Sequence, residues 1–279
     1  RPKEALIQLD IDPREIGKNY PANLGVVGDA KTVLTEMLYQ LERELRWKET
    51  QDFAEREAWV RELKTRHPRF IRPEGFDDVS LPMKPQRLMK ELRDALPGDG
   101  ILFVDIGNVM AWALHYFPVS EPGAFHVNLG FASMGHAVAS AIGGKLAAGD
   151  RPVVALVGDA AFAMNGMEVH TAVENDVPVV WLVMNNGGHG MVCHGERLQF
   201  KGKFTTGKFR RPLDVAALAE AMGARAFRVR RPGELGPALA QALASKQPAV
   251  IDARVDPDEM PPMGLRIETL DRFFEAEGG

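Results

Sequence analysis

Two polar motifs directly follow apolar runs that have the length of strands. Gly158-Asp159-Ala160 follows residues 153–157, and Asn185-Asn186 follows residues 177–184, with 25 residues between Asp159 and Asn185. In open parallel sheets, ligands bind beyond the carboxyl ends of the strands. Because one helix fits between the two runs, we expect a right-handed βαβ unit whose strands are adjacent. Asp159 and Asn186 should then lie side by side at one edge of the sheet.

The side chains at this edge are suited to a cation that is bound to phosphate. A carboxylate, an asparagine carbonyl and a free backbone carbonyl are hard oxygen donors, which suit Mg²⁺, and Mg²⁺ completes its octahedron with water and phosphate. Gly158, Ala160 and Ala161 are small, so backbone N–H groups at the start of the following helix can approach a phosphate. These residues therefore predict a site for a metal ion and a diphosphate group.

The elements that must position this site are typical of an α/β fold. Strands that are apolar throughout and alternate with helices predict a doubly wound, parallel, six-stranded sheet that helices cover on both faces. The predicted strands are residues 101–106, 125–127, 153–157, 177–184, 224–229 and 249–255. The predicted helices are residues 85–96, 134–148, 166–175, 213–222 and 235–245.

The beginning of the chain has a different pattern. Residues 5–12 predict a strand that Pro13 ends, and residues 17–28 predict a turn-rich stretch. Asp29 stands at the N-cap position of a helix whose apolar residues recur at helical spacing. Proline-rich residues 68–82 predict a linker. We therefore expect a strand and a helix in residues 1–67, a linker in 68–82 and the main domain in 83–279.

Composition argues against several kinds of partner. The chain has 34 Lys and Arg against 38 Asp and Glu, a net charge of −4, and so lacks the basic footprint of nucleic-acid binding. No apolar run approaches the roughly 20 residues that span a bilayer. Cys193 is the only cysteine, so no intrachain disulfide can form and a reducing compartment is expected. We expect a cytoplasmic protein that binds neither nucleic acid nor membrane.

The Gly-Asp-x and Asn-Asn motifs at this spacing resemble the signature of thiamine-diphosphate-dependent enzymes, with Ala160 in place of the commoner glycine. The whole chain resembles the acetolactate-synthase group of that superfamily. The segments that carry this resemblance, in chain order, are residues 10–20, 27–30, 84–86, 105–108, 129–135 and 260–263. The resemblance implies the domain that binds thiamine diphosphate and Mg²⁺, preceded by the end of the group's middle domain.

The resemblance also implies roles for single residues. Asp159, the Asn186 side chain and the Gly188 carbonyl would ligate Mg²⁺. Met134 would be the wedge that bends the cofactor, a role that suits a flexible thioether, and the Ala132 carbonyl would accept a hydrogen bond from the cofactor's 4′-amino group. The alternative for Met134 is a buried methionine that opens a helix. The implied cofactor-binding set is Asn108, Ala132, Ser133, Met134, Gly158, Asp159, Ala160, Ala161, Asn186, Gly188, His189 and Met191.

A second set of implications concerns what this chain lacks. The activating glutamate of these enzymes belongs to a separate pyrimidine-binding domain, and nothing here resembles that domain. The chain starts at Arg1 rather than at a methionine, which is typical of a trimmed or processed protein. We expect a chain that is inactive alone, that works with a second polypeptide or a detached N-terminal part, and that forms a dimer or tetramer. If FAD is used, its site would lie mostly in the missing middle domain.

The implied function is decarboxylation of a 2-oxo acid followed by carboligation to an acceptor carbonyl. Simple decarboxylation of a 2-oxo acid, or chemistry on an acyl-coenzyme A, is the alternative within the superfamily. A non-catalytic partner subunit is the alternative from another class, and retention of Asp159, Asn186 and Met134 argues against it. Glu168, in the helix that joins the two motifs, is interpreted as structural. The helix after Met134 is rich in small residues and should pack closely against another helix or a second subunit.

Three further groups of residues each allow two interpretations. His189, Cys193 and His194 could form a transition-metal site, but their spacing fits no zinc pattern, and a histidine that lines the substrate pocket is preferred. Gly195 stands where acetolactate synthases commonly have tryptophan, which leaves the substrate specificity open. A basic segment is either a solvated loop or an attractor of an anionic 2-oxo acid or a coenzyme A phosphate; its residues are Arg197, Lys201, Lys203, Lys208, Arg210 and Arg211.

Overall fold

The structure is a computed structural model that describes residues 4–45, 53–200, 202–203 and 206–262. The chain divides into two compact units, Arg1–Arg69 and Phe70–Gly279. Arg1, Lys201 and Met263, which Sequence analysis covers, lie outside the described residues. Within the described part, no helix has both the length and the apolar character needed to cross a membrane.

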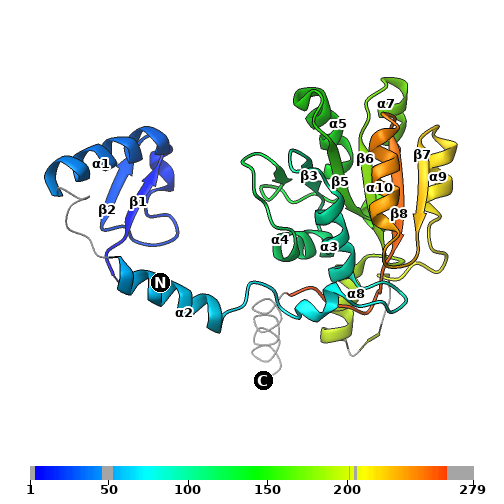
Figure 1. Cartoon of the computed structure of the whole chain (residues 1–279), viewed down its shortest axis with the longest axis horizontal. Helices are drawn as coiled ribbons and strands as arrows, with labels where there is room; N and C mark the ends of the chain where they lie inside the picture. Colours follow the sequence, from blue (N-terminus) through cyan, green and yellow to red (C-terminus); the bar gives the residue numbers. More distant parts are fainter. Residues whose placement is uncertain (1–3, 46–52, 201, 204–205, 263–279) are drawn as a thin grey trace. The chain divides into compact units, whose positions relative to one another are not determined.

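The first unit is a two-stranded parallel sheet with two helices (Figure 1). Its elements are β1 (Ile7–Asp10), a 3₁₀ turn (Pro13–Glu15), β2 (Leu24–Val27), α1 (Ala30–Leu45) and α2 (Ala54–Arg66). The predicted strand and N-cap are found, since the Asp29 carboxylate accepts a hydrogen bond of 2.9 Å from the Thr32 N–H. The sequence analysis missed β2, because four residues among turn formers are too few to display a strand period.

This first unit buries no apolar side chain among its described residues. Large apolar side chains on both strands and on α1 are exposed, and Ile7, Leu24 and Leu38 each expose more than half of their surface. A soluble domain normally encloses such side chains in a core. The unit therefore presents apolar surface on its sheet and on its first helix.

The second unit contains a six-stranded sheet in which every pair of neighbouring strands is parallel. The strand order is β4-β3-β5-β6-β8-β7. The bounds are β3 (Ile101–Val104), β4 (Phe125–Val127), β5 (Val153–Gly158), β6 (Val180–Asn185), β7 (Arg225–Val229) and β8 (Ala249–Arg254). Each lies at a predicted run, and the fold predicted from the sequence is confirmed.

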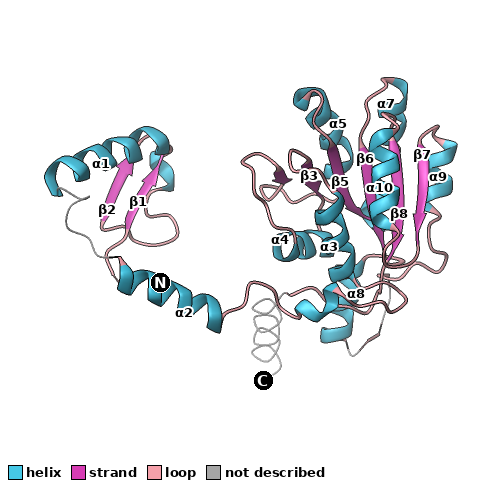
Figure 2. Ribbon diagram, in the orientation of Figure 1, coloured by secondary structure: helices cyan, strands magenta, loops and turns pink. Residues whose placement is uncertain are grey.

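Helices cover both faces of this sheet (Figure 2). One buried cluster joins the sheet to α3 (Pro85–Ala95), α4 (Asn108–Tyr116) and α10 (Leu235–Ala244). The other joins it to four helices, α5 (His136–Ala148), α6 (Asp159–Asn165), α7 (Glu168–Glu174) and α9 (Val215–Ala221). The central strands β5 and β6 are buried along almost their whole length, as expected for a sheet enclosed on both sides. The remaining helix, α8 (Gly190–Gln199), follows β6.

The connection between β5 and β6 corrects the expectation of a single helix. Two short helices, α6 and α7, occupy it, and they meet at Gly166. A Cβ atom at Gly166 would lie 2.5 Å from the Phe162 carbonyl oxygen, so the chain makes a close turn there that only glycine allows. The two strands are nevertheless adjacent, with Gly158 paired to Met184. The predicted neighbourhood of their carboxyl ends therefore holds.

The small residues of α5 allow a close approach to the sheet. Ala137 and Ala141 are buried against it, and a Cβ at Gly144 would lie 2.2 Å from the Phe103 ring of β3. Glycine at this position thus lets the helix backbone pass over an aromatic ring. The close packing that the sequence predicted is found against the sheet, and α5 also contacts α6 and α7.

Candidate functional site

A pocket of about 420 Å³ lies at the carboxyl edge of the large sheet. It is lined by segments that follow β3, β5, β6 and β8, together with Met134 and the start of α3. Most of the residues predicted from the sequence line it, namely Asn108, Met134, Gly158, Asp159, Ala160, Ala161, Asn186, Gly188, His189 and Met191. Ala132 and Ser133 do not.

Asp159 is the buried acid of this pocket. It ends β5 and begins α6, and its side chain is almost fully buried. The Gly187 N–H donates to its Oδ2 at 2.9 Å, and Gly187 has the left-handed backbone (φ +81°) that turns this N–H towards the carboxylate. Burial raises the pKa of Asp159 to about 6, although several backbone N–H groups oppose the rise. A nearby positive charge would restore the ionised form.

Three oxygen atoms converge beside Asp159. The Asn186 side-chain oxygen lies 3.1 Å from Asp159 Oδ1 and 2.9 Å from the Gly188 carbonyl oxygen. If the amide is turned round, its nitrogen donates a hydrogen bond to each of these oxygens. The choice between the two orientations depends on what occupies the space, since oxygens at this separation need either a proton donor or a cation between them.

Gly188 has its carbonyl fixed by a close contact behind it. The residue pairs with Lys208 in an isolated antiparallel bridge, and a Cβ at this position would lie only 2.3 Å from the Gly207 carbonyl oxygen. No residue larger than glycine fits there. Asp159, Asn186 and Gly188, which were predicted together, are therefore brought together by two adjacent strand ends and one tight loop.

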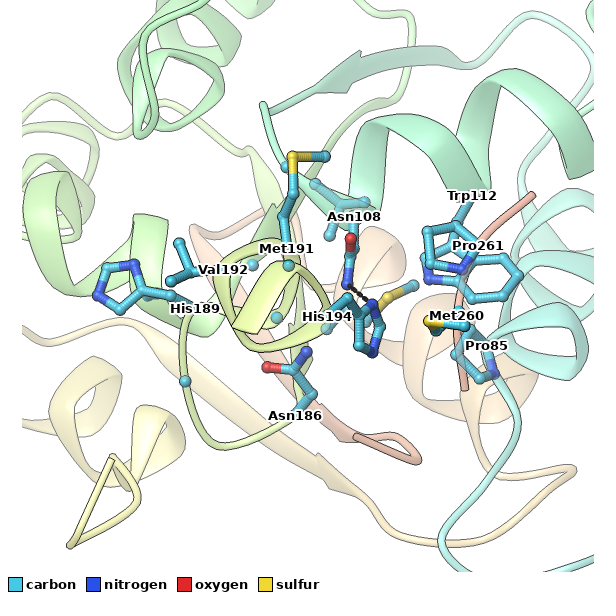
Figure 3. Close-up of a pocket in the computed structure, with 18 of the residues that line it drawn as sticks. Pro85, Asn108, Trp112, Asn186, His189, Met191, Val192, His194, Met260 and Pro261 are labelled. Atoms are coloured by element: carbon cyan, nitrogen blue, oxygen red, sulfur yellow. Dashed lines mark hydrogen bonds between the residues drawn. The ribbon is translucent and has the colours of Figure 1, made fainter. Parts of the chain in front are cut away.

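A second polar pair, Asn108 and His194, lies at the base of the pocket (Figure 3). His194 Nε2 is 3.1 Å from the Pro257 carbonyl oxygen, which can only accept, so this nitrogen carries the proton. Burial lowers the pKa of His194 and favours the neutral ring. Nδ1 therefore accepts from the Asn108 amide nitrogen at 3.1 Å, and the Asn108 oxygen is buried with no partner among the described residues.

Gly190 lies between the two asparagines of the pocket. A Cβ at Gly190 would lie 2.3 Å from the Asn186 amide nitrogen and 2.8 Å from that of Asn108. Both amides consequently occupy space that any other residue type would fill. The sequence analysis missed this function of Gly190, and no local pattern reveals it, because the two amides come from segments that are far apart in the chain.

Met134 lines the pocket from the loop before α5, rather than from the helix itself. The predicted helix began at residue 134, but α5 begins at His136 with Gly135 as its N-cap. Left-handed backbone at Ala132 (φ +57°) and Gly135 (φ +83°) keeps this loop out of the helix. A positive φ at a residue with a side chain stores strain, which is common at functional sites. Met134 directly precedes the N-cap of α5 and also packs against the core beneath that helix, so its role as a wedge stays a prediction.

The rest of the pocket wall is largely apolar, and sequence reasoning missed most of it. Trp112 of α4, Leu198 of α8 and the Met260-Pro261 pair line it. Only the Met-Pro element had been noted from the sequence. Gly195 also lines the pocket, and a Cβ there would meet nothing within 4 Å. The absence of a side chain at residue 195 thus leaves open space at this wall.

The alternative sites receive little support. Within the described residues, no group of three or more His, Cys, Asp or Glu is placed to hold a metal ion, and both ring nitrogens of His194 are already hydrogen-bonded. His189 lines the pocket and packs edge-on against Phe209. In the basic segment, Arg197 forms an ion pair with Asp258. Glu168 accepts a hydrogen bond from Thr171 and does not line the pocket.

Comparisons with known proteins identify the family of this chain. The family described as "Thiamine pyrophosphate enzyme, C-terminal TPP binding domain" matches residues 105–253, and the family described as "Thiamine pyrophosphate enzyme, central domain" matches residues 1–37. The first match contains Asp105, Asn108, Met134, Asp159 and Asn186.

Relatives with assigned names extend over almost the whole chain. Proteins named "Probable acetolactate synthase large subunit" from Methanococcus aeolicus and Methanocaldococcus jannaschii are 32% and 33% identical over 95% and 94% of this chain. The "Acetolactate synthase large subunit" of Corynebacterium glutamicum is 32% identical over 92%. The chain spans 46%, 44% and 41% of these three relatives, less than half of each. By fold, by pocket and by a family match over more than half of its residues, the chain belongs to the thiamine pyrophosphate enzyme family.

Proposed function

We propose that the pocket binds the diphosphate group of thiamine diphosphate through Mg²⁺. The ion would be held by the Asp159 carboxylate, the Asn186 side-chain oxygen and the Gly188 carbonyl. One observation carries this proposal, the convergence of these three oxygens. Around Mg²⁺ with ligand distances of about 2.1 Å, neighbouring oxygens of an octahedron lie about 3 Å apart. The separations of 3.1 and 2.9 Å agree with that spacing, and without an ion they are the lengths of two hydrogen bonds that the Asn186 amide donates once it is turned round.

The chemistry of this donor set fits Mg²⁺ and a diphosphate. One carboxylate and two neutral oxygens leave the remaining coordination positions to water and phosphate, as is usual for this ion. Gly158, Ala160 and Ala161 border the same part of the pocket, so no large side chain separates a phosphate from the backbone there. Burial raises the pKa of Asp159, and a bound cation would lower it again by favouring the carboxylate.

We propose that the reaction is decarboxylation of a 2-oxo acid with carboligation, as in acetolactate synthases. Thiamine diphosphate, when bound, supplies the carbanion chemistry and the electron sink that such a reaction needs. The chain's own residues bind and orient the cofactor, and the apolar wall that includes Trp112, Leu198 and Met260 excludes water. Exclusion of water strengthens electrostatic interactions within the pocket.

We propose that a pyrimidine-binding domain, carried by a second chain or by an N-terminal part, completes the enzyme, and that the enzyme is a dimer or tetramer. Support for this part of the proposal is that the chain spans less than half of relatives that are named as large subunits of acetolactate synthase. We expect the purified chain alone not to decarboxylate pyruvate with thiamine diphosphate and Mg²⁺. Robust turnover by the isolated chain would refute the need for a further domain.

Calorimetry with thiamine diphosphate tests the binding site itself. We expect the chain to bind thiamine diphosphate tightly only when Mg²⁺ is present. In Asp159→Ala we expect this tight binding to be lost, and the weak binding that remains should no longer depend on Mg²⁺. Asp214→Ala is a matched control, because Asp214 is an aspartate that caps α9 through the Ala217 N–H and does not line the pocket. Unchanged affinity in Asp159→Ala would show that the ligand assignment is wrong.

Product analysis separates the carboligase from its nearest alternative. A carboligase in complex with its missing domain would convert pyruvate, alone or with 2-oxobutyrate, into branched 2-hydroxy-3-oxo acids. A simple decarboxylase would release only the aldehyde and CO₂. The open space beside Gly195 gives no reason to prefer one acceptor over the other, so both substrates belong in the assay.

A further inference from the structure

Asp105 is a buried carboxylate at the end of β3 that does not line the pocket. Its backbone N–H donates to the Leu156 carbonyl of β5 at 2.9 Å. Its side chain accepts from three backbone N–H groups, those of Ile106 and Gly135 at 2.8 Å and that of Ala137 at 2.9 Å. A carboxylate in this setting has all its strong interactions with backbone, so it fixes chain segments rather than side chains.

The N-terminus of α5 explains why such an acceptor is needed. The first N–H groups of a helix lack partners within the helix, and a side-chain oxygen on the N-cap residue usually satisfies one of them. The N-cap here is Gly135, which has no side chain, and a Cβ at this position would lie 2.5 Å from Asn165 Oδ1. Asp105, thirty residues earlier in the chain, supplies the missing oxygen.

This arrangement links the two ends of the pocket. Through its backbone, Asp105 is attached to β5, which leads directly into Asp159. Through its side chain, it holds Gly135, the residue that follows Met134 and closes the strained loop at Ala132. One side chain thus ties the segment that carries Met134 to the strand that leads into Asp159.

We propose that Asp105 is a positioning residue for the ring part of the cofactor. It holds residues 132–135 at a fixed distance from the cation site, so that Met134 meets the rings of a ligand whose diphosphate is bound at Asp159. The proposal rests on the proposed function for the identity of that ligand. Asp105 would affect only the binding of the cofactor's rings, and it would do so through residues 132–135 rather than by contacting the cofactor.

Two probes separate ring binding from diphosphate binding in the full chain. Calorimetry with Mg²⁺ would compare thiamine diphosphate with inorganic pyrophosphate, which lacks the rings. Asp105→Asn places an amide nitrogen opposite at least one backbone N–H donor, so one buried hydrogen bond is lost. A loss of this kind corresponds to an affinity that is weaker by about tenfold or more. We expect that loss for thiamine diphosphate only, with pyrophosphate affinity unchanged. The matched control, Asp214→Asn, alters a helix cap away from the pocket and should preserve both affinities.

A second variant covers the case in which Asp105→Asn does not fold. Gly135→Ala leaves Asp105 intact but pushes the same segment away from Asn165, and the same selective loss of affinity for thiamine diphosphate is expected.

Hydrogen exchange should become faster at the Gly135 and Ala137 amides in Asp105→Asn. Equal weakening of both probes, or of neither, in the folded variants would overturn the positioning role. If the unaltered chain binds pyrophosphate with Mg²⁺ but gains nothing from the rings, only this proposal fails; if it binds neither probe, the proposed function fails as well.

Discussion

At the scale of single residues, the pocket contains a carboxyl group whose environment is unfavourable without a cation. Asp159 is buried, and its pKa is about 6 instead of the usual 3.8. A folded-state pKa above the unfolded value means that the folded chain holds the proton more tightly. Stability from this group is therefore present below about pH 4 and is lost as the pH rises through about 6. At neutral pH, the ionised Asp159 carboxylate, which suits a bound cation, therefore destabilises the folded protein when no cation is bound.

Asp159→Asn should consequently stabilise the chain in the absence of divalent ions. The difference between pKa values of 3.8 and about 6 corresponds to about 3 kcal/mol, which is an upper bound for the gain at pH 8, and the gain should shrink towards pH 4. Urea unfolding in chelator at both pH values would measure it. With Mg²⁺ and pyrophosphate added, the order should reverse, because only the unaltered carboxylate binds the ion well. A variant that is less stable than the parent in chelator at pH 8 would contradict this account.

Gly190 offers a second test at this scale. Gly190→Ala should displace the Asn186 and Asn108 amides, since its Cβ would lie within 2.8 Å of both nitrogens. We expect Mg²⁺-dependent pyrophosphate binding to weaken about tenfold, as for loss of one well-placed polar contact, with little change in melting temperature. Gly195→Ala in the same helix meets nothing within 4 Å and is the matched control. Equal calorimetric affinities for the two variants would exclude a role for Gly190 in placing the amides.

The residues that could be predicted from the sequence are those whose position follows from the strand that directly precedes them in the chain. Asp159 and Asn186 follow strands that the apolar runs identify, so their meeting could be foreseen from topology, whereas Gly188 was added by the family resemblance alone. The contact between Asn108 and His194 could not, because 86 positions separate them and it depends on where the end of β3 meets α8. The same holds for Asp105 and Gly135, where the helix cap is supplied from another strand.

At the scale of elements, the close approach of α5 to the sheet depends on Gly144, which has no side chain. Gly144→Ala would place a methyl group 2.2 Å from the Phe103 ring, and overpacking of this kind typically destabilises by about 1–3 kcal/mol. Gly143→Ala, one residue earlier in the same helix, meets nothing within 4 Å and should stabilise by up to about 1 kcal/mol. Thermal or urea unfolding of the two variants measures the contrast. Similar stability in both would mean that the helix can shift freely over the sheet.

Strands were easier to predict than helices for a physical reason. The central strands β5 and β6 are enclosed on both faces and so appear as continuous apolar runs. By contrast, α4, α6 and α8 each contribute residues to the pocket. With 7 to 10 residues each, they are too short to show a clear helical period, and none of the predicted helices corresponds to them. The short β2 was missed because its partner β1, rather than its own sequence, determines it.

At the scale of the whole molecule, the two units differ in how complete they are. The described buried core and every pocket-lining residue belong to Phe70–Gly279. A fragment that begins at Phe70 should therefore fold and bind Mg²⁺ and pyrophosphate with the affinity of the full chain. Circular dichroism and calorimetry on both proteins would test this. Failure of the fragment to fold, while the full chain folds, would assign residues 1–69 a stabilising role that their exposed apolar side chains do not indicate.

The strand order has a practical consequence for handling this protein. Most of the segments that line the pocket leave the sheet at one rim, after β3, β5, β6 and β8. The turns that enter these strands, such as residues 97–100, 149–152 and 246–248, therefore lie at the opposite rim. A fluorophore, an affinity tag or a surface anchor attached at those turns would be held away from the ligand, so the molecule can be immobilised or labelled without blocking entry.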